Sequence, residues 1–435
     1  MTKRAAVYVL GCKVNQHEAE AIKQLFKDAG YEIVPFKDWA DVYVIHTCTV
    51  THLGDRKSRQ MIRRAHRNNI NAIIAVTGCY AQTSPEEISG IEGVDLVIGS
   101  KERRRIVELV EKIDKTTTIS LVSPRKELRE FEDLPATSAS TVRAFLKIQE
   151  GCQQFCTYCI IPYARGPVRS RYLKDTVSTT RRLVGQGFKE IVLTGIHIGA
   201  YGQEMDNLNL AALLKELVKV PGLKRLRVSS VDPNEINEEL LNILTEEPVI
   251  CPHYHIPLQS GSDTILNKMH RPYDTETYGR LVRNIRMKRP NAAITSDVMV
   301  GFPGETDECF KETMNFIRDV KFADLHVFKY SPRKGTPAAE FSNQVAAPIK
   351  DFRSKEIINL GQELWQSYAS QFINRPKEVL VEQKMGSCWE GHTDNYLKIR
   401  FESPENLRGK FVEAIPIEIK KDYLLARLKG GVVNE

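Results

Sequence analysis

The first 125 residues alternate short apolar segments with longer amphipathic ones. Short runs of β-branched and apolar residues that end at polar residues or glycine predict buried strands at 5–10, 42–46, 73–77 and 94–98. Between the first two runs, residues 17–30 have helical periodicity and stop at a glycine. Strands that alternate with helices are typical of a parallel α/β sheet. We therefore predict an N-terminal α/β domain over residues 1–125.

A change of composition separates this domain from a second alternating region. Pro124, Pro135 and a run of charged and small polar residues predict a linker over 126–141. Beyond it, helical patterns such as 175–187, 235–246 and 307–320 separate six apolar runs, which are 144–149, 191–194, 225–229, 253–258, 294–300 and 325–330. Six βα units over about 190 residues favour a barrel-like parallel sheet, complete or partial, within residues 142–372.

The last part of the chain changes character again. A long helical stretch at 349–373 precedes short runs at 377–381, 396–401 and 410–419, which glycine and proline interrupt. Such runs predict a small all-β barrel over residues 373–435. The predicted class is α/β, with two parallel α/β domains followed by this barrel.

Composition narrows the class of protein. The chain has 435 residues, of which 42% are hydrophobic and 27% charged, so it is neither disordered nor fibrous. The net charge of +7 favours a polyanionic partner. No apolar run approaches the roughly 18 residues of a membrane span, and the first apolar segment is too short for a signal peptide. We expect a cytoplasmic protein without a membrane partner. Nine cysteines in such a protein indicate metal binding or redox chemistry.

Three cysteines are clustered directly after the first predicted barrel strand. Cys152, Cys156 and Cys159 have the spacing C-x3-C-x2-C. Three thiolates on one loop can ligate three irons of a four-iron cluster and leave the fourth iron open to a chelating ligand. A structural zinc site completed by a histidine is the alternative. No histidine lies within the loop, and the next one along the chain is His197.

Three further cysteines follow or end predicted N-terminal strands. Cys12, Cys48 and Cys79 lie at the ends of the first three runs. Parallel strands end along one edge of the sheet, which is where open α/β sheets bind ligands. The pattern therefore predicts a second three-cysteine site. The remaining cysteines, Cys251, Cys309 and Cys388, are assigned to packing.

The clustered cysteines and their context resemble the radical S-adenosylmethionine (SAM) superfamily. There, three cysteines hold a [4Fe–4S] cluster whose open iron is chelated by SAM. The resemblance implies further SAM-binding positions at Tyr158, Thr194, Gly195, Ser229, Ser230, Asp297, Gly301 and Pro303. Tyr158 is equally interpretable as a core aromatic residue, and Gly301 and Pro303 as ordinary turn residues.

Over its whole length the chain resembles the radical-SAM methylthiotransferases. The motifs are Leu-Gly-Cys-Lys-Val-Asn at 10–15, His-Thr-Cys-Thr-Val-Thr at 46–51 and Thr-Gly-Cys-Tyr-Ala-Gln at 77–82. The resemblance implies an auxiliary [4Fe–4S] cluster on Cys12, Cys48 and Cys79, a radical-SAM barrel, and a C-terminal TRAM barrel that binds RNA. The motifs are most similar to the branch that acts on N6-threonylcarbamoyladenosine in tRNA. The isopentenyladenosine and ribosomal-protein branches differ after the first cysteine.

The resemblance also implies the chemistry. An unactivated C–H bond of adenine is replaced by C–SCH3, which requires a radical and therefore a cofactor. The Cys152 triplet would serve radical formation from SAM, and the auxiliary cluster would present the methylated sulfur. A one-electron donor such as flavodoxin or ferredoxin is implied. Both clusters must face one cavity, so we expect the N-terminal sheet edge to cap the barrel mouth.

Substrate recognition has weaker signals. The basic segment 56–67 either binds phosphate or is a solvated helix face. Arg165, Arg169 and Arg171 either contact phosphate or SAM, or form internal salt bridges. The threonylcarbamoyl group carries a carboxylate, so a cation at the catalytic site would select it. Lys13, beside Cys12, is the first candidate and Arg169 the second.

Other functions remain open at this point. A methylthiotransferase of the isopentenyladenosine branch would use a different tRNA, and one of the ribosomal-protein branch would modify a protein aspartate. A non-catalytic iron–sulfur or zinc protein that binds RNA is the alternative of another class. Metal analysis distinguishes the non-catalytic protein from the enzyme, because an enzyme with two four-iron clusters contains about eight irons per chain.

Overall fold

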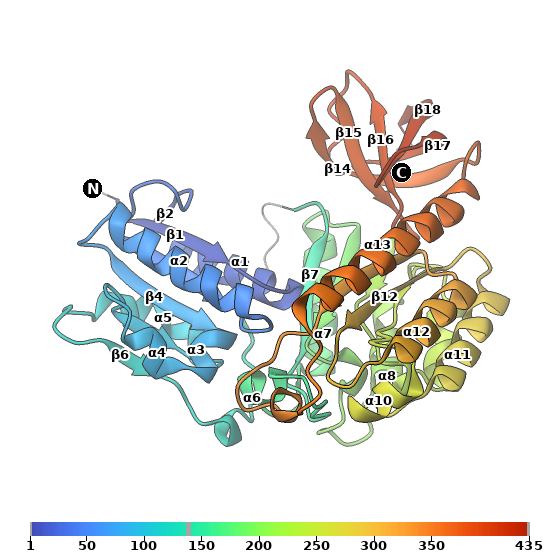
Figure 1. Ribbon diagram of the computed structural model, residues 1–435. Coiled ribbons are helices and arrows are strands. Elements are labelled where there is room, and N and C mark those ends of the chain that lie inside the picture. Colours follow the sequence, from blue (N-terminus) through green and yellow to red (C-terminus); the bar gives the residue numbers. More distant parts are fainter. Residues whose placement is uncertain (1, 136–140, 433–435) are drawn as a thin grey trace.

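The computed structural model describes residues 2–135 and 141–432. Figure 1 shows an N-terminal sheet domain, a larger sheet-and-helix domain, and a small barrel at the end of a long helix. The N-terminal sheet is entirely parallel, in the order β2-β1-β3-β4-β5-β6. Its strands are β1 (Arg4–Val9), β2 (Glu32–Ile33), β3 (Val42–Thr47), β4 (Ile73–Gly78), β5 (Leu96–Ile98) and β6 (Ile119–Leu121). The four predicted strands are confirmed, and β2 and β6 are additional short strands at the edges.

Helices cover both faces of this sheet. Ile22 and Phe26 of one helix pack on one face, and Ile62 and Ala65 of another pack on the other. The helices are α1 (Lys13–Asp28), α2 (His52–Asn68), α3 (Cys79–Thr83), α4 (Pro85–Ser89) and α5 (Ile106–Glu111), with the 3-10 turns η1 (Arg103–Arg105) and η2 (Arg125–Glu127). The first helix begins earlier than the predicted 17–30, because extended backbone at Cys12 caps it directly after β1.

The second domain is a partial barrel of six parallel strands. They are β7 (Ala144–Glu150), β9 (Glu190–Gly195), β10 (Arg225–Val228), β11 (His253–His255), β12 (Ala293–Val300) and β13 (Asp324–Lys329). Regular pairing joins β7-β9-β10 and β11-β12-β13, and the amide of Val231 donates to the carbonyl of His255 at 3.1 Å between the two groups. In the described part of the chain β7 and β13 do not pair, so the barrel is open along one side. The six predicted strands are confirmed.

Helices enclose the outside of the partial barrel over the largest apolar core. They are α6 (Ile161–Arg165), α7 (Leu173–Gly185), α8 (Leu210–Leu217), α9 (Glu238–Glu246), α10 (Asp263–Lys268), α11 (Thr275–Lys288), α12 (Asp307–Val320) and α13 (Ala347–Ser370), with η3 (Ile198–Ala200), η4 (Pro233–Glu235) and η5 (Pro337–Glu340). A two-residue strand, β8 (Arg169–Ser170), pairs antiparallel with the end of β7 and was not predicted. No described helix is both long and apolar enough to cross a membrane.

The C-terminal part is a closed five-stranded barrel with the order β14-β15-β16-β18-β17. Its strands are β14 (Lys377–Met385), β15 (Cys388–Thr393), β16 (Lys398–Glu402), β17 (Phe411–Ile419) and β18 (Leu424–Val432). Three of them were predicted. Arg225 and Arg227 of β10 attach this barrel to the second domain, because they donate to the carbonyls of Glu378 at 2.9 Å and Asp394 at 2.9 Å.

Candidate active site

Cys12, Cys48 and Cys79 lie along one edge of the N-terminal sheet. Each follows or ends one of the strands β1, β3 and β4, which are neighbours in the sheet. Gly11, with φ +105°, lets the first two segments approach, since a Cβ at this position would lie 3.0 Å from the Cys48 sulfur. The sequence prediction that these strand ends meet at one edge is confirmed.

The three thiols influence one another electrostatically. Burial, together with the neighbouring Cys79 and Cys12, raises the pKa of Cys48 to about 12. Burial likewise raises the pKa of Cys79, although the Arg165 guanidinium opposes this. Three thiolates this close are stable only when a cation compensates their charge, and metal binding then releases their protons.

The spacing of both cysteine triads argues against a single tetrahedral zinc. A Zn–S bond of about 2.3 Å puts two ligand sulfurs about 3.8 Å apart. Among the described residues, the one group of three metal-ligating side chains whose ligand atoms all lie within 4.8 Å is His255, Asp297 and His326. Neither cysteine triad belongs to such a group, and three thiols without a fourth ligand are the donor set of a [4Fe–4S] cluster with one open iron.

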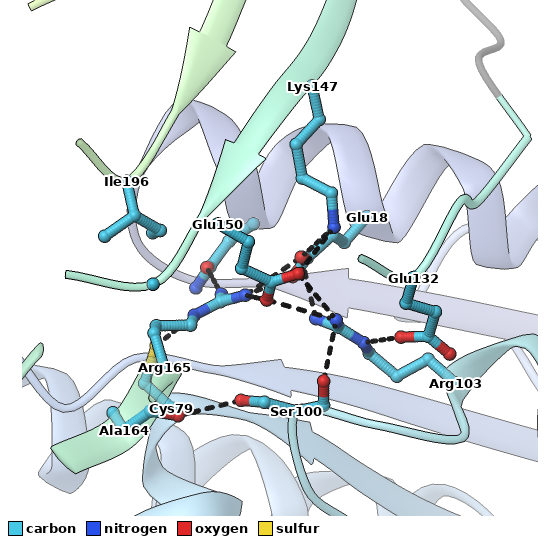
Figure 2. Close-up of polar contacts among 12 residues, drawn as sticks. Glu18, Cys79, Ser100, Arg103, Glu132, Lys147, Glu150, Ala164, Arg165 and Ile196 are labelled. Atoms are coloured by element: carbon cyan, nitrogen blue, oxygen red, sulfur yellow. Dashed lines mark hydrogen bonds and ion pairs between the residues drawn. The ribbon is translucent and has the colours of Figure 1, made fainter. Parts of the chain in front are cut away.

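Arg165 joins the N-terminal triad to the second domain (Figure 2). Its Nε donates to the Cys79 sulfur at 3.2 Å, and one terminal nitrogen donates to Asn15 Oδ1 at 2.6 Å. The other terminal nitrogen lies 2.9 Å from Glu18 and 2.8 Å from Glu150. Arg165 of the second domain thus contacts Cys79, a predicted cluster ligand in the N-terminal domain.

This arginine belongs to a buried network with more cations than carboxylates. Glu18 and Glu150 have fully buried side chains, and Glu132 lies at the rim. Four cations pair with these three carboxylates, namely Arg103, Lys147, Arg165 and Arg169. Four positive and three negative charges leave an excess of one positive charge beside Cys79. A thiolate at Cys79 would neutralise it, which favours this cysteine as a ligand that is bound in its ionised form.

Arg165, Arg169 and Arg171 form internal contacts, as one of the two sequence interpretations proposed. Arg169 is buried, pairs with Glu150 at 3.4 Å and donates to backbone carbonyls, so it is no carboxylate selector. Arg171 pairs with Asp133 at 2.9 Å. The proposal of Arg169 as second candidate for substrate selection is therefore wrong.

The second triad occupies the loop between β7 and α6. The chain reaches it through Gly151, with φ +80°, where a Cβ would collide with the carbonyl of Pro167. Burial raises the pKa of Cys156 and of Cys159. Arg271 donates to the Cys156 sulfur at 3.2 Å and pairs with Asp232 at 2.7 Å. Each triad therefore has one sulfur that accepts a hydrogen bond from a carboxylate-anchored arginine.

His197 lies beside this triad, which the sequence argument did not anticipate. Its Nδ1 is 3.6 Å from the Cys152 sulfur, and its Nε2 is 2.7 Å from Glu235. Burial lowers the pKa of His197, but the bonds to Cys152 and Glu235 outweigh burial and raise it to about 11. The 45 residues between Cys152 and His197 are thus no argument against His197 as a fourth ligand of a zinc ion. The ligand spacing is the argument against zinc.

A cavity of about 210 Å³ adjoins the second triad. Val50 and Thr51, just after Cys48, line it together with Cys159 from the second triad. Its other walls are Tyr158, Ile160, Ile161, Gln259, Asp297, Met299, Phe328, Lys329, Tyr330 and Ser331. The N-terminal sheet edge therefore caps the barrel mouth, as predicted. Arg333 secures the cap through Asp55 at 2.6 Å.

Two of the eight predicted SAM positions, Tyr158 and Asp297, line this cavity. The Ser229 hydroxyl donates to the carbonyl of Leu193 at 2.5 Å, and the amide of Gly301 donates to Glu305 at 2.6 Å. These contacts shape the strand ends. A SAM-binding role remains a prediction for all eight positions, including Tyr158 and Asp297.

Lys13 begins α1 and is exposed. Its charge contributes to lowering the pKa of the buried His253 of β11, whose main cause is desolvation. It also acts on His326 of β13 and on Tyr396 of the C-terminal barrel. Lys13 therefore lies near the place where the three domains meet.

Known proteins with similar sequences establish the family. Residues 4–99 match the family described as "Uncharacterized protein family UPF0004", and residues 146–317 match the radical SAM superfamily. The chain is 48% identical over 417 residues to the threonylcarbamoyladenosine tRNA methylthiotransferase MtaB of Bacillus subtilis, covering 94% of this chain and 92% of the relative. It is 40% identical to the enzyme of the same name from Aquifex aeolicus, covering 95% and 100%. The chain belongs to the radical-SAM methylthiotransferases.

More distant relatives place this methylthiotransferase within the family and the fold. A tRNA-2-methylthio-N6-dimethylallyladenosine synthase of Alkaliphilus oremlandii is 32% identical, covering 100% of this chain and 93% of the relative. The radical SAM methyltransferase TsrM of Kitasatospora setae, with cobalamin and a [4Fe-4S] cluster bound, superposes with a TM-score of 0.58 at 16% identity, covering 78% and 77%. That likeness concerns the fold alone. The predicted cofactors, SAM and two [4Fe–4S] clusters, are those of the family.

Proposed function

We propose that this methylthiotransferase converts N6-threonylcarbamoyladenosine, next to the anticodon of tRNA, into its 2-methylthio derivative. The observation that supports the chemistry is one cavity lined by Cys159 of the second triad and by Val50 and Thr51, which follow Cys48 of the first. The choice of substrate is supported by the 48% and 40% identical relatives that bear this activity in their names. The dimethylallyladenosine synthase at 32% identity supports the isopentenyladenosine branch less well.

The six cysteines would hold the two clusters. Bound at Cys152, Cys156 and Cys159, a cluster with SAM supplies the radical that removes the adenine hydrogen, and one at Cys12, Cys48 and Cys79 supplies the sulfur. Other residues of the chain stabilise these ligands and the cavity beside them. Arg165 and Arg271 donate N–H···S hydrogen bonds that stabilise ionised cysteines. The capping contacts between the two domains enclose the cavity, which keeps water from a reactive intermediate.

Binding of the tRNA would involve surfaces away from the cavity. Arg56, Lys57, Arg63, Arg64 and Arg67 of α2 are exposed, as a phosphate-binding helix face requires. The C-terminal barrel would contribute RNA contacts next to the same mouth. Because the substrate is tRNA, we expect the enzyme to work in the cytoplasm, with flavodoxin or ferredoxin as electron donor.

Nucleoside mass spectrometry of tRNA from cells that lack the gene tests the proposal. We expect the 2-methylthio form of threonylcarbamoyladenosine to disappear while the isopentenyl counterpart stays at its normal level. The wild-type gene should restore it, and a gene carrying Cys156→Ala should not. Loss of the isopentenyl form instead would move the protein to the other tRNA branch, and intact tRNA nucleosides with an unmodified ribosomal protein would refute the tRNA substrate.

A further inference from the structure

Three neighbouring strands bring a polar cluster together on the inner face of the partial barrel. His255 of β11, Asp297 of β12 and His326 of β13 form it. His255 Nε2 lies 3.4 Å and His326 Nδ1 lies 3.3 Å from the same oxygen, Asp297 Oδ1. The two imidazole rings are 5.5 Å apart. In the parallel register, His326 is directly opposite Asp297, so backbone pairing fixes this contact.

Strand geometry and neighbouring hydrogen bonds fix the orientation of the three side chains. Successive residues of a strand point to opposite faces, and Tyr254, Val298 and Val327 beside it pack into or against the apolar core. His255 Nδ1 lies 3.0 Å from the Thr295 hydroxyl, which turns the other ring nitrogen toward Asp297. In the described part of the chain, neither arginine nor lysine forms an ion pair with this carboxylate. Its charge is therefore directed at the two histidines.

The cluster adjoins the cavity beside the second cysteine triad. Asp297 lines this cavity together with Cys159. His326 is 58% exposed, on the face of β13 that it shares with the cavity residue Phe328. The hydrogen bond to Asp297 raises the pKa of His326 and outweighs the Lys13 ammonium of the N-terminal domain, which acts to lower it. Two potential cations, one on each domain, thus lie at the margin of the space that the substrate must enter.

We propose that His326, held by Asp297, together with Lys13 binds the carboxylate of the threonylcarbamoyl substituent and thereby selects this nucleoside. The inference rests on the proposed function and adds a residue that the sequence did not single out. His326 is a specificity residue that touches the substrate, and Asp297 is a positioning residue that acts through it.

The chemistry of the side chains supports this assignment. When Nδ1 donates to Asp297, the Nε2–H of a protonated His326 is on the far side of the ring and can donate to a ligand. The hydrogen bond to Asp297 raises the pKa of His326, which stabilises the imidazolium. A carboxylate would pair with this imidazolium and with the Lys13 ammonium. An apolar isopentenyl group would leave both cations desolvated and unpaired, which disfavours it.

Competition between two substrates tests the proposal on the enzyme with both clusters in place. The substrates are the same tRNA carrying either threonylcarbamoyladenosine or isopentenyladenosine, and kcat/KM is measured for each. We expect His326→Leu to lower kcat/KM for the threonylcarbamoyl tRNA roughly 10- to 100-fold, mainly through KM, and to leave the isopentenyl tRNA unchanged or improved. His326→Gln, which keeps a donor, should retain most of the discrimination. Asp319→Asn, an exposed carboxylate on the preceding helix α12 that does not act on His326, is the control and should match wild type.

The outcomes are distinguishable. Discrimination that is unchanged in His326→Leu overturns the inference while the proposed function stands. Wild-type enzyme that leaves threonylcarbamoyl tRNA unmodified overturns the proposed function itself. Metal analysis adds a third arm: a stoichiometric divalent metal other than iron, present in wild type and lost in His326→Leu, would show that the three side chains bind a metal ion and would overturn direct recognition.

Discussion

Replacement of Glu18 by glutamine tests the buried network between the two sheet domains. The side chain of Glu18 is fully buried, and its carboxylate lies 2.7 Å from Arg103, 3.0 Å from Lys147 and 2.9 Å from Arg165. Burial alone would raise the pKa of Glu18, but these cations hold it well below its usual range. The group is thus ionised, and Glu18→Gln removes one buried negative charge while it keeps the volume.

The expected cost follows from the charges. The substitution changes the excess of the network from one positive charge to two, and the new amide presents an NH2 group toward N–H donors. Removal of one partner from a buried ion pair costs about 3–5 kcal/mol, and we expect a loss of that size in the free energy of unfolding. Urea denaturation of the cluster-free protein, followed by circular dichroism, measures it.

Glu20→Gln is the matched control on the same helix. Glu20 is 28% exposed and pairs with Lys23, so its replacement should cost less than about 0.5 kcal/mol. A loss below about 1 kcal/mol for Glu18→Gln would refute the reasoning, because it would mean that water or a rearranged partner already screens the cations.

Three further predictions concern the iron content, the pH dependence of stability, and the redox potential of the barrel cluster. Cys48→Ala should lower the iron content from about eight to about four atoms per chain, whereas Cys251→Ala should leave it unchanged; an iron assay that finds about eight in the first variant contradicts the assignment. Burial, aided by Lys147, lowers the pKa of His17 to about 3, so only the unfolded state takes up this proton as the pH falls below about 6.5. From pH 7 to pH 5 this histidine should therefore cost about 2 kcal/mol of stability, and His17→Phe should reduce that slope in denaturation curves; identical slopes would contradict it. Arg271→Lys removes a guanidinium donor from the Cys156 sulfur and should shift the potential of the barrel cluster to a more negative value in an EPR-monitored redox titration, while the auxiliary cluster keeps its potential.

The cysteine sites were predictable from the sequence because they follow from strand topology. Cys12, Cys48 and Cys79 come at the ends of apolar runs, and a parallel sheet aligns such ends whatever the loops between them do. The second triad is local in sequence. The six barrel strands were found because short segments with apolar and β-branched residues alternate with helical patterns along this part of the chain.

The residues that surround these cysteines were not predictable from local patterns. His197 contacts a cysteine 45 residues away, and Arg271 contacts one 115 residues away, each through a loop whose path depends on the folded domain. Arg165 was noticed, but its contact with Cys79 crosses a domain boundary. The strands β2 and β6 were missed because two or three residues are too few to show a period.

Domain docking and iron binding are linked through one arginine. Arg165 is in the second domain, but it binds Glu18 and the Cys79 sulfur of the first. The network that holds the two domains together has one positive charge in excess, and ionisation of Cys79 removes that excess. Iron bound at Cys79, as predicted, would ionise this thiol. Iron binding should therefore strengthen the contact between the domains, and a loosened contact should weaken iron binding to the same extent. The N-terminal domain would then be held most firmly against the barrel when iron is bound at its three cysteines.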